Sequence, residues 1–294
     1  MNKVDIASWV GNDPDNIAFR QAAHTILHAI SVKEVLQSSM IMKGGVLLAL
    51  GYRSQRYTGD IDFSTPLKLS DFDQELFKEQ LDEGLVSAVE NLGYGLDCRI
   101  QRVEQKPARD DASFPTITTT VGYAYKRDTK AHIRLMQRRS LHVIKLDYSL
   151  NESIGSIDFF ELEDGNVIRV YDTIELISEK FRALLQQEVR NRVRAQDLYD
   201  LYYILDVCSL EKDDKLKAHI LLRLIEKSNS RNLVVSTESM GNKEIRRRSE
   251  EGYKSLPSLV EEELLDFDKI YYEIERFYRS LPWDTVANTK LLLK

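Results

Sequence analysis

Two aspartates separated by one residue, Asp60 and Asp62, limit how this chain can fold. Successive residues of a β-strand point to opposite faces, so both carboxylates project from one face if the run from Gly59 to Phe63 is a strand. Like charges held this close repel each other, and a hard cation bound between them relieves the repulsion. Alone, such a pair usually marks only a solvated strand face, so the neighbouring sequence has to decide between the two interpretations.

A glycine pair lies shortly before the aspartates. The run from Ile41 to Leu50 predicts a short apolar strand, a turn at Gly44 and Gly45, and the start of a helix. Free backbone N–H groups at such a helix N-terminus bind phosphate. A phosphate-binding turn followed closely by metal-binding carboxylates indicates phosphoryl chemistry on a nucleotide.

A third carboxylate, Asp147, ends the alternating apolar run that begins at His142. An acid at the end of a mostly buried strand is costly unless it is paired or bound to metal. Three carboxylates on adjacent strands could hold two Mg²⁺ ions about 3.5–4 Å apart, as in two-metal phosphoryl transfer. We therefore predict Asp60, Asp62 and Asp147 as metal ligands.

Hydrophobic periodicity divides the chain near Tyr171. Before it, helical and strand patterns are mixed, and after it only helical patterns follow. Helices are expected at 15–37 and 70–91 and strands around 42, around 61 and at 94–104, 115–125, 139–150 and 167–170. Further helices are expected at 173–187, 196–208, 213–228 and 257–280, with a polar loop within 229–253. Periodicity alone thus predicts an α/β domain over 1–171 and a helical domain over 172–294.

Four segments resemble, in the same order along the sequence, motifs of the AbiEii/AbiGii toxin family. The members of this family are nucleotidyltransferase-like toxins of type IV toxin–antitoxin and abortive-infection systems. Lys43-Gly44-Gly45 together with the run from Arg56 to Phe63 resembles the first motif, and the run from Leu146 to Ser149 resembles the second acidic strand. Later lysine and aspartate motifs are matched by segments that begin at Lys180 and Asp197. The four segments keep the order of the family over about the middle two-thirds of the chain.

This resemblance implies a polymerase-beta-like nucleotidyltransferase core with a small mixed sheet, followed by a helical domain that completes the active-site cleft. It implies an NTP substrate and two Mg²⁺ ions. The catalytic residues that it implies are Asp60, Asp62, Asp147, Lys180 and Asp197, and the nucleotide-binding residues are Lys43, Gly44, Gly45, Arg56 and Lys180.

Two positions depart from the family pattern. Many relatives carry a hydroxyl residue after the glycine pair, where this chain has Val46, and an arginine before the last aspartate, where it has Gln196. Arg190, Arg192 and Arg194 lie close enough in sequence to be candidates for replacing that arginine.

The expected reaction is transfer of NMP from an NTP to an acceptor hydroxyl, with release of pyrophosphate. The resemblance favours RNA, particularly tRNA, as the acceptor, with inhibition of growth, a role in phage defence and a cognate antitoxin as partner. A protein hydroxyl, an antibiotic acceptor or a non-catalytic nucleotide-binding module are the alternatives.

Charged residues concentrate in one segment between two expected strands. Lys126, Arg127, Lys130, Arg134, Arg138 and Arg139 could form a hairpin that follows a nucleic-acid backbone. A solvated basic loop would have the same composition.

Composition limits the class of protein. A net charge of −6 argues against a protein whose whole surface binds nucleic acid nonspecifically, though not against a local basic patch. Two cysteines, Cys98 and Cys208, are too few for a disulfide framework or a zinc site. The N-terminus has no apolar signal segment, and no apolar run reaches the ~20 residues of a membrane span. We therefore expect a cytoplasmic protein.

Overall fold

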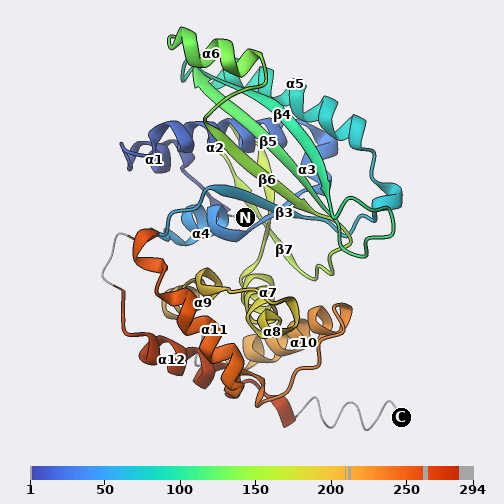
Figure 1. Ribbon diagram of the computed structural model, residues 1–294, viewed down its shortest axis with the longest axis vertical. Coiled ribbons are helices and arrows are strands. Elements are labelled where there is room, and N and C mark those ends of the chain that lie inside the picture. The colour runs from blue at the N-terminus through green and yellow to red at the C-terminus, as the bar shows by residue number, and fades with distance from the viewer. Residues whose placement is uncertain (1, 209, 211–212, 261–263, 285–294) are drawn as a thin grey trace. The chain divides into compact units, whose positions relative to one another are not determined.

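Residues 2–208, 210, 213–260 and 264–284 are described by a computed structural model, in which the chain divides into two units (Figure 1). The first unit comprises residues 1–53 and 58–171, and the second comprises residues 54–57 and 172–294. The segment 54–57 thus groups with the helical residues, whereas the sequence pattern grouped it with the α/β residues.

The first unit is built on a mixed eight-stranded sheet with the order β1-β7-β8-β2-β3-β6-β5-β4. The strand bounds are β1 Asn2–Lys3, β2 Ile41–Lys43, β3 Asp60–Ser64, β4 Leu96–Lys106, β5 Thr116–Tyr125, β6 Val143–Ser149, β7 Ile157–Glu161 and β8 Val167–Tyr171. Strand β3 pairs parallel with β6 and antiparallel with β2. The predicted α/β class is confirmed, but the sheet is larger than the small one expected, because β1 and β7 carry no alternation that reveals them in the sequence.

The helices of this unit are α1 Ile6–Gly11, α2 Ile17–Ser31, α3 Glu34–Ser39, α4 Gly44–Tyr52, α5 Gln74–Leu92 and α6 Thr129–Met136, with a 3₁₀ turn at Leu69–Asp71. Helices α2 and α5 pack against each other and against β4. Their contact is close, because a Cβ on Gly84 would lie 2.7 Å from the Ala29 carbonyl oxygen. A small residue is therefore required at the crossing.

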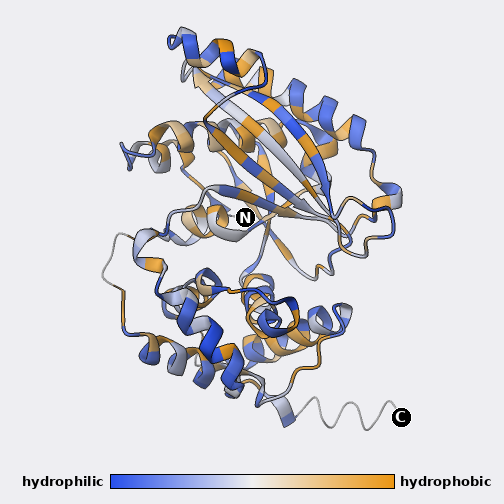
Figure 2. Cartoon of the chain, in the orientation of Figure 1, coloured by the Kyte–Doolittle hydropathy of each residue, from blue (hydrophilic) through white to orange (hydrophobic). Residues whose placement is uncertain are grey.

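Register places apolar side chains together on the sheet face that α2 and α5 cover. Ile61 and Phe63 of β3 pair with Leu146 and Tyr148 of β6. On the other side of β6, Leu146 pairs with Thr119 and Tyr148 pairs with Ile117 of β5. The alternation of apolar and polar residues along β4, β5 and β6 is visible in Figure 2. Since the side-chain period of a strand is two, the residues between these positions face the other way, and they carry the polar groups of the sheet.

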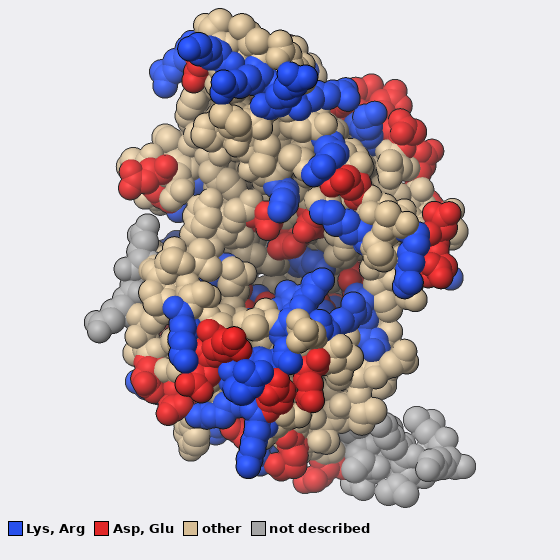
Figure 3. Space-filling view, in the orientation of Figure 1, with Lys and Arg blue, Asp and Glu red and all other residues tan. Residues whose placement is uncertain are grey.

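The basic segment after β5 forms helix α6 rather than the expected hairpin. The Asp128 side chain caps it by accepting a hydrogen bond from the Ala131 N–H, and Leu135 is fully buried beneath it. A single buried apolar residue gave too weak a helical pattern to be recognised among so many charges. Lysine and arginine side chains gather over α6 in Figure 3.

The second unit is helical. Its elements are α7 Thr173–Leu185, α8 Gln187–Arg190, α9 Ala195–Cys208, α10 Asp214–Ser230, α11 Lys243–Tyr253 and α12 Phe267–Arg279, with 3₁₀ turns at Ser239–Gly241 and Leu256–Ser258. Helix α11 lies within 229–253, where only a loop was expected, because its polar sequence has little apolar periodicity. It is capped by Asn242, whose side chain accepts from Glu244 N–H and Ile245 N–H.

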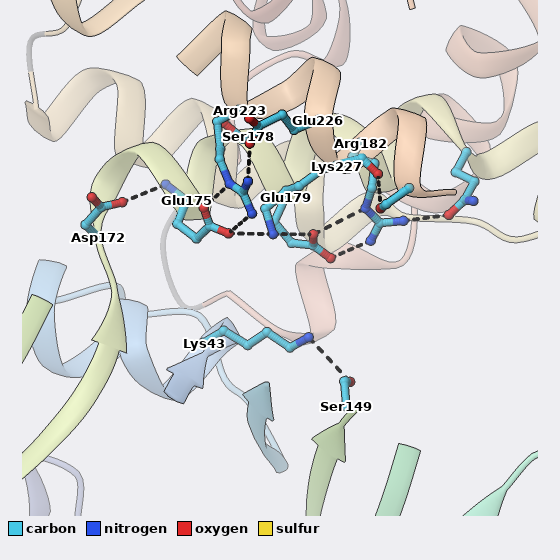
Figure 4. A network of polar contacts seen from close by, with 12 residues as sticks. Lys43, Ser149, Asp172, Glu175, Ser178, Glu179, Arg182, Arg223, Glu226 and Lys227 are labelled. Carbon is cyan, nitrogen blue, oxygen red and sulfur yellow. Dashed lines mark hydrogen bonds and ion pairs between the residues drawn. The ribbon is translucent and has the colours of Figure 1, made fainter. Parts of the chain in front are cut away.

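Helices α7 and α10 are joined by a buried ionic network (Figure 4). Glu175, which is fully buried, lies 2.6 Å from Arg223 Nε and 2.8 Å from Lys227 Nζ. Lys227 also contacts Glu179, at 3.2 Å, and Glu179 bonds Arg182. Each buried charge is neutralised by a partner, which is the condition under which buried charges are tolerated.

Candidate active site

The three predicted metal ligands lie on one face of the sheet. Asp62 and Asp147 are direct register partners on the parallel strands β3 and β6, and Asp60 pairs with Lys145. Neighbouring strands lie about 4.8 Å apart, so the carboxylates of Asp62 and Asp147 start from adjacent backbone positions. Sequence alternation predicted the common face of Asp60 and Asp62, and the fold brings Asp147 beside them.

The electrostatics of this face favour binding of a cation. Partial removal from solvent raises the pKa of Asp60, the charge of Asp147 raises it further, and Lys145 lowers it. Asp147 Oδ1 accepts a hydrogen bond of 2.7 Å from the Thr118 hydroxyl of β5, which fixes the orientation of that carboxylate. The Thr-rich run 116–120 was read only as a strand, and its role beside Asp147 was missed.

The glycine turn contacts the carboxylates directly. Gly44 has φ +75°, and a Cβ at this position would lie 2.2 Å from Asp62 Oδ2. Both the backbone conformation and the close approach require glycine. Gly44 begins helix α4, and the side chain of its N-cap residue, Lys43, makes no capping hydrogen bond. Its first N–H groups therefore lie near the predicted metal ligands. Val46 is fully buried in this helix, so its position offers no side-chain contact to a phosphate.

Lys43 lies on the same face. It is the register partner of Asp62 on β2, and its Nζ donates to the Ser149 hydroxyl over 3.4 Å (Figure 4). Since Ser149 follows Asp147 by two residues on β6, this contact directs the Lys43 ammonium along the row of carboxylates. Five predicted residues, Lys43, Gly44, Asp60, Asp62 and Asp147, are thus assembled in the first unit, with Gly45 buried next to Gly44.

Within the described residues, no three Asp, Glu, His or Cys side chains converge as a ready-made metal site. The donor chemistry nevertheless fits Mg²⁺, because carboxylate oxygens are its preferred protein ligands. The raised pKa of Asp60 also reflects like-charge repulsion that a cation would relieve. The three-carboxylate metal site stays a prediction.

The other predicted residues form a cluster in the second unit. Arg56 donates two hydrogen bonds to the Asp200 carboxylate, from Nε to Oδ1 at 2.7 Å and from Nη2 to Oδ2 at 2.9 Å. Lys180 Nζ donates to Asp200 Oδ2 at 2.7 Å and to Asp197 Oδ1 at 3.2 Å. The side chains of Arg56, Lys180 and Asp200 are almost completely buried. Asp200, which the sequence left without a defined role, is the centre of this cluster.

Charge pairing sets the ionisation of the cluster. Burial opposes ionisation of Asp200, but Lys180 and Arg56 hold its pKa below the usual range. Burial likewise opposes the charge on Lys180, and Asp200 and Asp197 raise its pKa above the usual value. All three groups therefore stay charged at neutral pH. The spacing of Asp197 and Asp200, three residues apart on one helix face, was the available signal for this arrangement.

An arginine also stands beside the last aspartate motif despite Gln196. Arg194 Nη1 lies 3.8 Å from Asp197 Oδ2. The loop before α9 is held by the buried Gln187, whose Oε1 accepts from Arg194 N–H at 2.8 Å and whose Nε2 donates to Ser249 Oγ at 3.0 Å. Of the three arginines considered as replacements, Arg194 is the one that contacts Asp197.

Comparison with known structures agrees with this fold. MenT4, a nucleotidyltransferase toxin from Mycobacterium tuberculosis, superposes with a TM-score of 0.53 at 17% identity, covering 95% of this chain and 90% of its own. A candidate nucleotidyltransferase from H. pylori gives 0.51 at 16% identity, covering 92% and 95%. No curated protein sequence matches the chain.

The family model described as "Nucleotidyl transferase AbiEii toxin, Type IV TA system" matches residues 25–273. This span contains the glycine turn, the three predicted metal ligands and the Arg56–Lys180–Asp200 cluster. Both the predicted fold and the predicted family are confirmed, and the chain belongs to the AbiEii family of nucleotidyl transferase toxins.

Proposed function

We propose that this protein transfers NMP from an NTP to a hydroxyl of an RNA acceptor, most specifically tRNA, and that the transfer inhibits growth. The observation that carries the proposal is the pairing of Asp62 with Asp147 on adjacent strands, with Gly44 packed against the Asp62 carboxylate. Phosphate-binding backbone and metal-binding side chains are then within reach of a single triphosphate.

Asp60, Asp62 and Asp147 would hold two Mg²⁺ ions. Bound there, the metal would lower the pKa of an attacking hydroxyl and neutralise charge on the transferred phosphate. The Thr118 hydroxyl donates its hydrogen bond to Oδ1 of Asp147, and Oδ2 would accept the proton of the acceptor hydroxyl. The acceptor oxygen then bonds the α-phosphorus as the bond to the leaving pyrophosphate breaks.

The glycine turn and Lys43 would bind the triphosphate. The N–H groups of Gly44 and Gly45 would donate hydrogen bonds to phosphate oxygens, because they begin helix α4 and its N-cap side chain, Lys43, makes no capping hydrogen bond. The Lys43 ammonium, bonded only weakly to Ser149 at 3.4 Å, would add a positive charge. Such preorganised donors provide much of the rate acceleration in phosphoryl transfer.

Arg56 and Lys180, expected as phosphate ligands, are both engaged by Asp200. We assign Arg56 the role of a positioning residue, which holds Asp200 and through it Lys180. Lys180 in turn fixes Asp197, leaving the second Asp197 oxygen near Arg194. Asp197, the more exposed of the two carboxylates bound to Lys180, would then be the member of this cluster that contacts substrate.

Antitoxin binding is proposed from the family alone, whose description names a type IV toxin–antitoxin system. No helix among the described residues is long and apolar enough to cross a membrane. We propose that the protein acts in the cytoplasm, where NTPs and RNA are both present.

The proposal is tested with each α-labelled NTP, Mg²⁺, total RNA and lysate protein. Wild type should label RNA, whereas Asp62→Asn and Asp147→Asn should not. Asp110→Asn, at an exposed position between β4 and β5, is the matched control and should label RNA normally. Undiminished RNA labelling by Asp147→Asn contradicts the mechanism. Label in protein instead of RNA supports a protein acceptor, and no label with any NTP supports a binding module.

A further inference from the structure

Six exposed cations surround helix α6. They are Lys126, Arg127, Lys130, Arg134, Arg138 and Arg139, which we call the α6 basic surface. Asp128 is the single acidic residue between positions 126 and 139, and its side chain is used to cap the helix. The surface is visible as a continuous band of basic side chains over α6 in Figure 3. Such a concentration is unusual in a chain with a net charge of −6.

This surface is rigidly anchored. His132 of α6 lies 2.9 Å from the buried carboxylate of Asp97 on β4. The Gln101 side chain donates to the Leu135 carbonyl and accepts from the Ser140 N–H, so that both ends of the connection are tied to β4. A solvated loop would need none of these buried contacts. The backbone that carries the cations is therefore held in place, which lowers the entropic cost of binding a ligand.

The surface lies on the same sheet face as the carboxylates. Gly122 and Val143 are register partners, and Gly122 faces the segment that follows α6, because a Cβ there would lie 2.7 Å from Ser140 Cβ. Val143, Lys145 and Asp147 follow one another on that face of β6. At about 3.3 Å per residue, Val143 is ~13 Å from Asp147. Lys145, which is exposed, adds a positive charge within this interval, whereas Arg102 of β4 is ion-paired with Glu104 at 3.1 Å.

We propose that the α6 basic surface binds the phosphate backbone of the RNA acceptor a few nucleotides away from the hydroxyl that is presented at Asp147. The proposal rests on the proposed nucleotidyltransferase function and adds the site that selects a polynucleotide over a nucleoside. A polymer fits better than a single phosphate, because the cations are spread over a helix and both flanks. An acidic protein partner is the alternative that the test must exclude.

The test compares two triple variants that each remove three positive charges. Lys130→Gln, Arg134→Gln and Arg139→Gln neutralise the α6 basic surface. Arg247→Gln, Arg276→Gln and Arg279→Gln are the control, since these exposed arginines are ion-paired with Glu244, Glu273 and Glu275. Equilibrium binding to RNA is measured without NTP over a range of salt concentrations, and NMP transfer is measured with long RNA and with a dinucleotide acceptor.

The α6 variant should bind RNA on the order of tenfold more weakly than the control. Its slope of log K against log salt should be smaller by about 2, the contribution of three phosphate contacts on a single strand. KM should rise for long RNA and stay unchanged for the dinucleotide. Because these binding measurements need no catalysis, they decide the proposal even if NMP transfer to RNA fails. Equal RNA affinity and equal salt slope in the two variants would overturn the proposal and favour an acidic protein as the ligand of the α6 basic surface.

Discussion

Replacing Gly44 with alanine perturbs the site through a single methyl group. The added Cβ would lie 2.2 Å from Asp62 Oδ2, so the carboxylate or the turn must retreat by about 0.8 Å to restore even a 3.0 Å contact. At φ +75° an alanine is also strained, by roughly 1–2 kcal/mol. Because a shift of about 1 Å in a catalytic group can lower a rate ~100-fold, we expect kcat to fall by about that factor.

Gly93→Ala separates the two effects. Gly93 has a similar φ of +62° at the end of α5, but a Cβ there meets nothing within 4 Å. It should therefore lose the same roughly 1–2 kcal/mol of stability as Gly44→Ala loses to backbone strain, while keeping its activity. Thermal unfolding and NMP transfer are measured on both variants. Equal activity of Gly44→Ala and Gly93→Ala would refute the argument that Gly44 is needed for its contact with Asp62.

Three further predictions concern charge. Mg²⁺ should lower the raised pKa of Asp60, measured by carboxyl NMR titration in wild type and Asp62→Asn, and an unchanged Asp60 titration would contradict the metal site. Because the pKa of Asp200 is depressed, its contribution to stability is present above the unfolded value of 3.8 and is lost as pH falls through the folded value. Asp200→Asn should therefore lower the free energy of unfolding at pH 7 by about 3 kcal/mol and flatten its acid dependence, in urea titrations at several pH values. Glu175→Gln, which leaves Arg223 and Lys227 buried without their shared carboxylate, should lower the free energy of unfolding by roughly 3 kcal/mol, whereas loss of the exposed Arg247–Glu251 pair should leave stability nearly unchanged in the same urea titrations.

The sequence was most informative where a local rule has a single structural outcome. Alternation along β3 requires Asp60 and Asp62 to share a face, and the Gly44–Gly45 pair requires a turn into α4. The resemblance then linked these to Asp147, whose place next to Asp62 depends on a parallel pairing across more than 80 residues. No local pattern specifies such a pairing: the strand pattern identified Asp147 as a costly acid, and only the fold shows that it lies next to Asp62.

Residues whose roles arise from tertiary contacts were missed. In the sequence, Thr118 is one of several threonines in an expected strand, and only the β5–β6 register places it next to Asp147. Asp200 resembles any helical acid until folding buries it between Arg56 and Lys180. Helix α6 has only one buried apolar residue to give a helical pattern, and its anchor, the buried Asp97, is over 30 residues away in the sequence. Long-range partners of this kind are not encoded in spacing.

The assignment of residues 54–57 to the helical unit has a consequence for how the chain can be cut. The Arg56 guanidinium, which neutralises Asp200, precedes the rest of that unit by more than a hundred residues. A fragment starting at Asp172 would keep Lys180 and Asp200 but discard this arginine, leaving a buried carboxylate short of one counter-ion. A fragment truncated at Asp172 should therefore be destabilised. To study the helical unit separately, the segment that carries Arg56 must be supplied by circular permutation or co-expression.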